Sequence, residues 1–91
     1  MPGLSIRLSM SISSLLTSFL DDPEVSVRRL AATRAPTTML AQYARDRAWE
    51  VRWEVAVRAP ERLARELAMD IEPEVRAAAR ERLGQLAHGP G

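Results

Sequence analysis

The 91-residue sequence contains no cysteine, no lysine and few aromatic side chains. Without cysteine, the chain cannot form a disulfide framework, a thiolate zinc site or a cysteine-ligated iron–sulfur cluster, and it has no thiol nucleophile. All 13 basic residues are arginine, whose planar fork suits carboxylates and phosphates. The 12 acidic residues leave a net charge of +1, which provides no overall field that would attract nucleic acid.

Long apolar runs are also missing. A membrane-spanning helix needs roughly 18 apolar residues, and no segment reaches that length. The first 20 residues, MPGLSIRLSMSISSLLTSFL, are interrupted by serine and arginine, and no A-x-A cleavage site follows them. We therefore expect a cytoplasmic protein without a membrane partner.

Residue patterns typical of catalysis are absent as well. The one histidine, His88, lies in the terminal HGPG, which we interpret as a flexible tail at residues 88–91. The sequence has no glycine-rich phosphate loop, no cluster of metal ligands and no Ser-His-Asp set. We expect no enzymatic activity, no metal and no cofactor.

The chain repeats itself with a period of 24 residues and without gaps. The copies begin near Asp22, Asp46 and Asp70, and the register extends backwards to Leu15 and Phe19. The other aligned positions are Val27, Val51 and Val75; Arg28, Arg52 and Arg76; Arg34, Arg58 and Arg82; Pro36 and Pro60; Met39 and Leu63; and Tyr43 and Leu67. A short period with so many matching positions is typical of a repeat architecture.

Each copy is expected to form two short helices, the first capped by its aspartate and ended by a proline. The expected ranges are 24–34, 48–58 and 72–83 for helix one, and 37–44 and 61–68 for helix two. In the first copy Val27, Leu30 and Ala31 share one side of helix one at i, i+3, i+4 spacing. One such helix cannot bury its apolar side alone, whereas stacked copies form a continuous core.

The stretches DPEVSVRRLAATRAP and EVRWEVAVRAP resemble the leucine-rich repeat variant family, a relative of HEAT-type helical repeats. The resemblance implies an all-α fold, a short right-handed α-solenoid in which an α-helix alternates with a shorter or 3-10 helix. It covers residues 13–87, which we expect to be one helical-repeat domain. Family members with an iron–sulfur cluster carry cysteines before the repeats, and this chain has none.

Residues 1–12 do not follow the helical pattern. Leu4, Ile6, Leu8, Met10 and Ile12 alternate with polar residues, the period-two pattern of a half-buried strand. This strand-like arm could lie over the end of the solenoid or be a disordered terminus. Alternatively, it pairs with a second copy or with a partner's sheet edge, which would make the protein a homo-oligomer.

The first arginine column contains Arg28, Arg52 and Arg76, each six residues after an aligned aspartate. These arginines could pair with an aspartate of the same or a neighbouring copy, as the resemblance to HEAT-like repeats also implies. We favour this structural role because buried charges need partners. The alternative is a stripe that binds phosphate or an acidic peptide.

The second arginine column, Arg34, Arg58 and Arg82, lies at the end of helix one, where a cation offsets the helix dipole. We expect these three side chains to be more exposed than the first column, and therefore better candidates for contact with a partner.

Trp49 and Trp53 do not recur in the other copies. They are one helical turn apart, on a face that the spacing assigns to Ala56 and Val57 as well. The indoles could fill gaps left by alanine in adjacent copies, and Arg29 could stack on Trp53. The alternative is an aromatic anchor for a partner, because Trp and Arg dominate binding hot spots.

The sequence therefore predicts a non-catalytic module that binds another protein and self-associates. Nucleic-acid backbone binding through the arginine columns is the alternative. The candidate partner-binding residues are Trp53, Trp49, Arg29, Arg52, Arg58 and Arg34; the candidate self-association arm is Leu4, Ile6, Leu8, Met10 and Ile12.

Removing residues 1–12 tests the arm. If the arm pairs between copies, the truncated chain should elute as a monomer in size-exclusion chromatography with light scattering, while the intact chain elutes as an oligomer. Two monomeric chains of equal thermal stability would show that the arm is not a pairing strand.

Overall fold

The fold is known from a computed structural model, which describes residues 19–88. The strand-like arm of residues 1–12 lies outside the described residues, as do residues 89–91. Most of the described residues are helical, and no strand occurs among them. The expectation of a helical protein is thus confirmed for this part of the chain.

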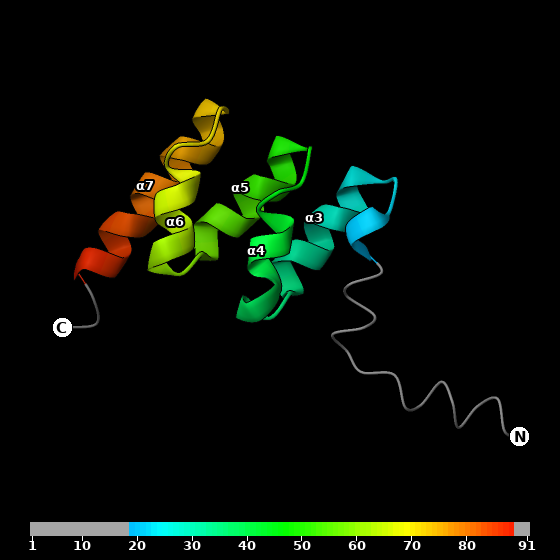
Figure 1. The fold of residues 1–91 in the computed structure, drawn as a ribbon, viewed down its shortest axis with the longest axis horizontal. Helices are drawn as coiled ribbons and strands as arrows, with labels where there is room; N and C mark the ends of the chain where they lie inside the picture. The colour runs from blue at the N-terminus through cyan, green and yellow to red at the C-terminus, as the bar shows by residue number, and fades with distance from the viewer. Residues whose placement is uncertain (1–18, 89–91) are drawn as a thin grey trace, which may run out of the picture.

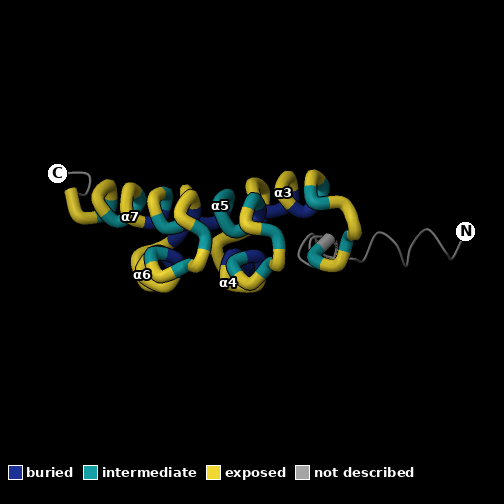
Figure 2. Tube along the Cα trace, turned by 90° about the horizontal axis from the view of Figure 1, so that it is seen from above, coloured by how far each residue is buried: buried dark blue, intermediate teal, exposed yellow. Residues whose placement is uncertain are grey.

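The described helices form two layers (Figures 1 and 2). The elements are η1 (Phe19–Asp21), α3 (Val25–Arg34), η2 (Thr37–Met39), α4 (Leu40–Tyr43), α5 (Trp49–Arg58), α6 (Glu61–Leu67) and α7 (Pro73–His88). One layer holds α3, α5 and α7 side by side, and the other holds α4 and α6. A longer and a shorter helix thus alternate along the chain, as the 24-residue period predicts.

The core lies between the two layers (Figure 2). Val51 and Val55 of α5 and Val75 of α7 are fully buried, as are Leu40 and Tyr43 of α4. The remaining core residues are mostly alanine, whose small side chain allows helices to approach closely. Of the valines at the repeated positions, Val51 and Val75 are buried and Val27 is half-buried, so the apolar stripes of α5 and α7 belong to the core more fully than that of α3.

The helix of the third copy is longer than expected. We expected it to end at Leu83, but α7 continues to His88. Gly84 stands where the earlier copies have Pro36 and Pro60. Proline lacks the N–H that a helix needs, whereas glycine retains it, so the third copy continues as one straight helix instead of turning.

The expected apolar side of α3 is only partly buried. Ala31 is buried, but Leu30 is 54% exposed. In the second copy the residue equivalent to Leu30 is Glu54, which reaches back to Arg29 of α3. Position 30 therefore corresponds to the side of α5 that contacts the preceding copy.

The repeated aspartates are not the N-caps that we expected. The N-cap residues of α3 and α5 are Glu24 and Ala48, and neither has a side-chain capping bond. Each aspartate lies two residues before the N-cap position, and its Oδ1 accepts a hydrogen bond from the N–H at that position. The bonds run from Glu24 N to Asp22 (2.9 Å), from Ala48 N to Asp46 (2.8 Å) and from Glu72 N to Asp70 (2.9 Å). The aspartates thus stabilise the turn that leads into each long helix.

Replacing Val55 by alanine tests the position of the core. Loss of a fully buried side chain should lower the free energy of unfolding by about 2 kcal/mol, from lost burial and the cavity left behind. Val57→Ala is the matched control, since Val57 belongs to the same helix and is 43% exposed. Urea denaturation followed by circular dichroism measures both; equal losses would contradict the described packing.

Candidate functional site

The first arginine column forms a ladder of ion pairs between successive copies. Arg28 donates from Nε to Asp46 Oδ2 at 2.8 Å and from Nη2 to Oδ1 at 3.2 Å. Arg52 binds Asp70 in the same way, at 2.8 and 3.1 Å. The pairs are well shielded, with side chains 2% and 6% exposed in the first and 13% and 10% in the second. The predicted pairing with a neighbouring copy is confirmed for these two arginines.

The third nitrogen of each fork binds within its own copy. Nη1 of Arg28 donates to the carbonyl oxygen of Asp22, and Nη1 of Arg52 donates to that of Asp46. Each fork therefore binds both its own copy and the next one. Arg76 donates to the carbonyl oxygens of Asp70 and Ile71, and no carboxylate among the described residues pairs with it.

The electrostatics of the ladder appear in the pKa of Asp70. Burial alone would raise this pKa, but hydrogen bonds from the Arg52 side chain and the Glu72 N–H lower it. The positive charges of Arg52 and Arg76 act in the same direction, and the net pKa lies below the usual value. The folded state thus favours the ionised carboxylate.

The second arginine column is not a simple exposed stripe. Arg58 donates to the carbonyl oxygens of Ala32 and Ala35 at 2.7 and 2.8 Å, at the end of the preceding long helix. The Ala32 carbonyl lacks its usual helical donor because position 36 is proline. Arg82 repeats part of this contact through a 2.8 Å bond to the Ala59 carbonyl. The greater exposure that we expected holds for Arg34, but Arg58 and Arg82 are partly buried.

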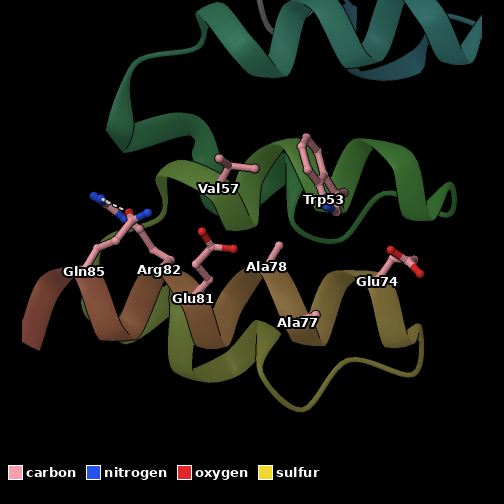
Figure 3. Close-up of a pocket in the computed structure, with 8 residues that line it drawn as sticks. All are labelled: Trp53, Val57, Glu74, Ala77, Ala78, Glu81, Arg82 and Gln85. Carbon is pink, nitrogen blue, oxygen red and sulfur yellow. Dashed lines mark hydrogen bonds between the residues drawn. The ribbon is translucent and has the colours of Figure 1, made fainter.

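A groove of about 360 Å³ runs between α5 and α7 (Figure 3). Trp53 and Val57 contribute its α5 side, and Ala77 and Ala78 lie opposite them on α7. The remaining lining residues are polar: Glu74, Glu81, Arg82 and Gln85. Trp53 also packs against the edge of the core, so one indole joins the groove to the hydrophobic interior.

A second hollow of about 250 Å³ adjoins the first, because Trp53 and Glu74 line both. Trp49, Glu50 and Arg29 complete it. Trp49 is 38% exposed, which is high for so large an apolar side chain. Trp49, Trp53 and Val57 thus lie along two adjoining hollows on the layer formed by α3, α5 and α7.

The charges around this groove are mostly unpaired carboxylates. Arg29 binds Glu54 through Nη2 at 2.7 Å, and Arg82 is held by the Ala59 carbonyl. The three lining glutamates, Glu50, Glu74 and Glu81, have no hydrogen-bond or ion-pair partner among residues 19–88. The bond to a carbonyl leaves the positive charge of Arg82 in place, so three unpaired carboxylates face one unpaired guanidinium and the net charge of the lining is negative.

The structure brings together Trp49, Trp53 and Arg29 among the predicted site residues. It separates the others: Arg52 belongs to the ladder, Arg58 binds carbonyl groups, and Arg34 lies exposed at the end of α3. Arg29 lines the same hollow as Trp53, and its guanidinium pairs with Glu54. The predicted face is also corrected at one position: Ala56 is fully buried, so only Val57 accompanies the tryptophans.

Sequence reasoning missed the α7 side of the groove. Ala77 and Ala78 lie 24 and 25 residues after Trp53, the offset at which adjacent long helices meet. The same offset of 25 separates Arg29 from Glu54. The sequence anticipated that alanine would face the indoles, but the indole of Trp53 leaves the space beside the alanines open.

The described part of the chain holds neither a cluster of metal ligands nor a membrane-spanning helix. No group of three or more histidine, aspartate or glutamate side chains there is arranged to hold a metal ion. No helix within residues 19–88 is long and apolar enough to cross a membrane. The groove around Trp53 is thus the most developed candidate site among these residues.

Replacing Asp70 by asparagine tests the ladder. At pH 7 the change should lower the free energy of unfolding by roughly 1–3 kcal/mol, because the Arg52 fork loses its counter-charge. A carboxyl with a lowered folded-state pKa stabilises the protein above its unfolded pKa of about 4, and this contribution disappears as the pH falls through the folded value.

The difference between the wild-type and Asp70→Asn proteins should therefore shrink on acidification in urea titrations. Asp21→Asn removes the same charge from an exposed position and is the matched control. A constant difference at all pH values, or an equal effect of both substitutions, would contradict the ladder's role.

Comparison of the chain with protein-family models, curated proteins and solved structures gave no match. The functional assignment therefore depends on the geometry of this chain's own residues. Most of the repeated arginines bind within the protein, whereas the non-repeating tryptophans line an open groove.

Proposed function

We propose that this chain is a non-catalytic protein-binding module, built as a short α-solenoid related to the leucine-rich repeat variants. Recurrence of the Arg–Asp contact after 24 residues supports the solenoid, since equivalent residues make equivalent contacts in successive copies. The alternation of α3, α5 and α7 with the shorter α4 and α6 supports it as well.

The groove beside Trp53 is the single observation that carries the binding function. Monomeric proteins rarely leave large apolar side chains exposed together, and such surfaces mark interaction sites. Trp49 and Val57 are 38% and 43% exposed on either side of the half-buried Trp53. Tryptophan supplies a large contact area, and only two rotatable bonds must be ordered when a partner binds.

Nucleic-acid binding through the arginine columns is the weaker candidate. Arg28 and Arg52 are saturated by carboxylates and carbonyl groups, and Arg58 is engaged with the end of α3. These forks would have to abandon internal acceptors before they could reach a phosphate. The unpaired carboxylates beside the groove would also repel a polyanion.

Substituting the tryptophans tests the proposed function. Proteins captured from a lysate of the source cells by the immobilised wild-type chain should be lost with Trp49→Ala and Trp53→Leu, with affinities at least tenfold weaker. Met69→Ala is the control, because Met69 is 83% exposed and lies away from the groove. The leucine variant retains an apolar side chain against the core, which limits unfolding.

The outcome against the proposal is capture that is unchanged in both tryptophan variants. Tight binding of a 20-base-pair DNA or RNA duplex that weakens steeply with salt would instead favour the nucleic-acid alternative. Thermal melts of each variant accompany the capture, so that loss of fold is distinguished from loss of binding.

A further inference from the structure

The chemistry of the groove indicates what kind of segment binds there; this inference rests on the proposed binding function. Glu74 and Glu81 are seven residues apart on α7, which is about two helical turns, or roughly 10 Å along one side of the helix. In Figure 3, Glu74 lies at one end of the row of α7 side chains that line the groove, and Glu81 lies between the alanines and Arg82. Both are exposed, and neither has a partner in the described part of the chain.

Between these carboxylates, α7 presents only the methyl groups of Ala77 and Ala78. The opposite wall is formed by Trp53 and Val57. A bulky aliphatic or aromatic side chain can therefore enter the centre of the groove and contact the indole. The apolar part of the groove is thus flanked by Glu74 on one side and by Glu81, with Arg82 beyond it, on the other.

The adjoining hollow extends the same chemistry at the Glu74 end. Trp49 and Trp53 contribute two indoles there, with the carboxylates of Glu50 and Glu74 beside them. Indole faces and carboxylates both attract a guanidinium or ammonium group. Arg29 does not neutralise this hollow, because its fork is bound to Glu54.

We propose that the partner of this groove is a basic segment of another protein, with two cationic side chains about 10 Å apart and an apolar side chain between them. Arginine or lysine at positions i and i+3 of a segment in the polyproline II conformation has about this spacing on one side, as do positions i and i+7 of a helix. The cations meet Glu74 and Glu81, and the apolar side chain lies against Trp53. An acidic segment would instead meet three unpaired carboxylates and only one unpaired cation, Arg82.

Selection from a library of random 12-residue peptides displayed on phage tests this assignment, with the wild-type chain as bait and Trp53→Leu as counter-selection. The expected consensus contains two basic residues at a spacing of three or seven around an apolar residue. Binding is then measured with synthetic peptides through the fluorescence of Trp49 and Trp53, the only tryptophans in the chain.

The charge requirement is tested separately with Glu74→Gln and Glu81→Gln, which keep the side-chain shape. Each should weaken a selected basic peptide roughly three- to tenfold, and the double variant should weaken it further. Glu66→Gln is the matched control, because Glu66 is exposed on α6 in the other layer. The affinity should also fall with added salt, since the pairs are exposed.

The outcomes separate the two proposals. Peptides that require Trp53 but are acidic or uncharged, or whose binding is unchanged in the two glutamine variants, would overturn the basic partner and leave the protein-binding groove intact. Recovery of no peptide that depends on Trp53 would overturn the basic partner, and unchanged capture by the tryptophan variants would overturn the binding function itself.

Discussion

The two-layer arrangement depends on the bidentate pair between an arginine of one copy and the aspartate of the next, 18 residues further along the chain. The aspartate does two things at once: it accepts the N–H of the turn before its own helix, and it receives the fork of the preceding copy. The arginine also holds the carbonyl of its own copy's aspartate. Because every donor and acceptor has a partner, the charges can be shielded from water without the penalty of an unpaired buried ion. The relative position of α3 and α5, and of α5 and α7, is thereby defined.

A second contact depends on proline. Pro36 removes a helical N–H, and Arg58 of the next copy binds the carbonyl that this leaves without a donor. The arginines of both repeated columns are therefore largely consumed by the scaffold. Arg34 alone of the second column stays exposed, and the clearest residues left for another purpose are the two tryptophans, which depart from the repeat. In such a chain, residues for binding a partner are therefore expected at the non-repeating positions of the long helices.

Much of the helical organisation followed from local sequence. Prolines and apolar spacing predicted helices that agree with α3, α5 and α6 to within about one residue at each end. The same reasoning predicted the end of the last helix too early. Gly84 replaces the proline of the earlier copies, but α7 continues through it to His88. The spacing within α3 also placed Leu30 in the core, but Leu30 is exposed. Whether a helical residue is buried depends on which other helix packs against it, and the spacing within α3 does not show that. Helical spacing placed Ala56 on the same face as the tryptophans, but Ala56 is buried in the core. Such spacing defines a broad face, and a residue at its edge can point either to the core or to solvent.

The sequence by itself determined the 24-residue period, the alternation of long and short helices and the identity of the exceptional residues, because these depend on composition and on contacts within a few residues. The tertiary structure alone decided which acceptors each arginine reaches, and that the side chains opposite Trp53 are Ala77 and Ala78. It also placed unpaired carboxylates rather than arginines beside the indoles. Such relations join residues 18 to 26 positions apart, and their distances are set by how two helices pack, which no local pattern specifies.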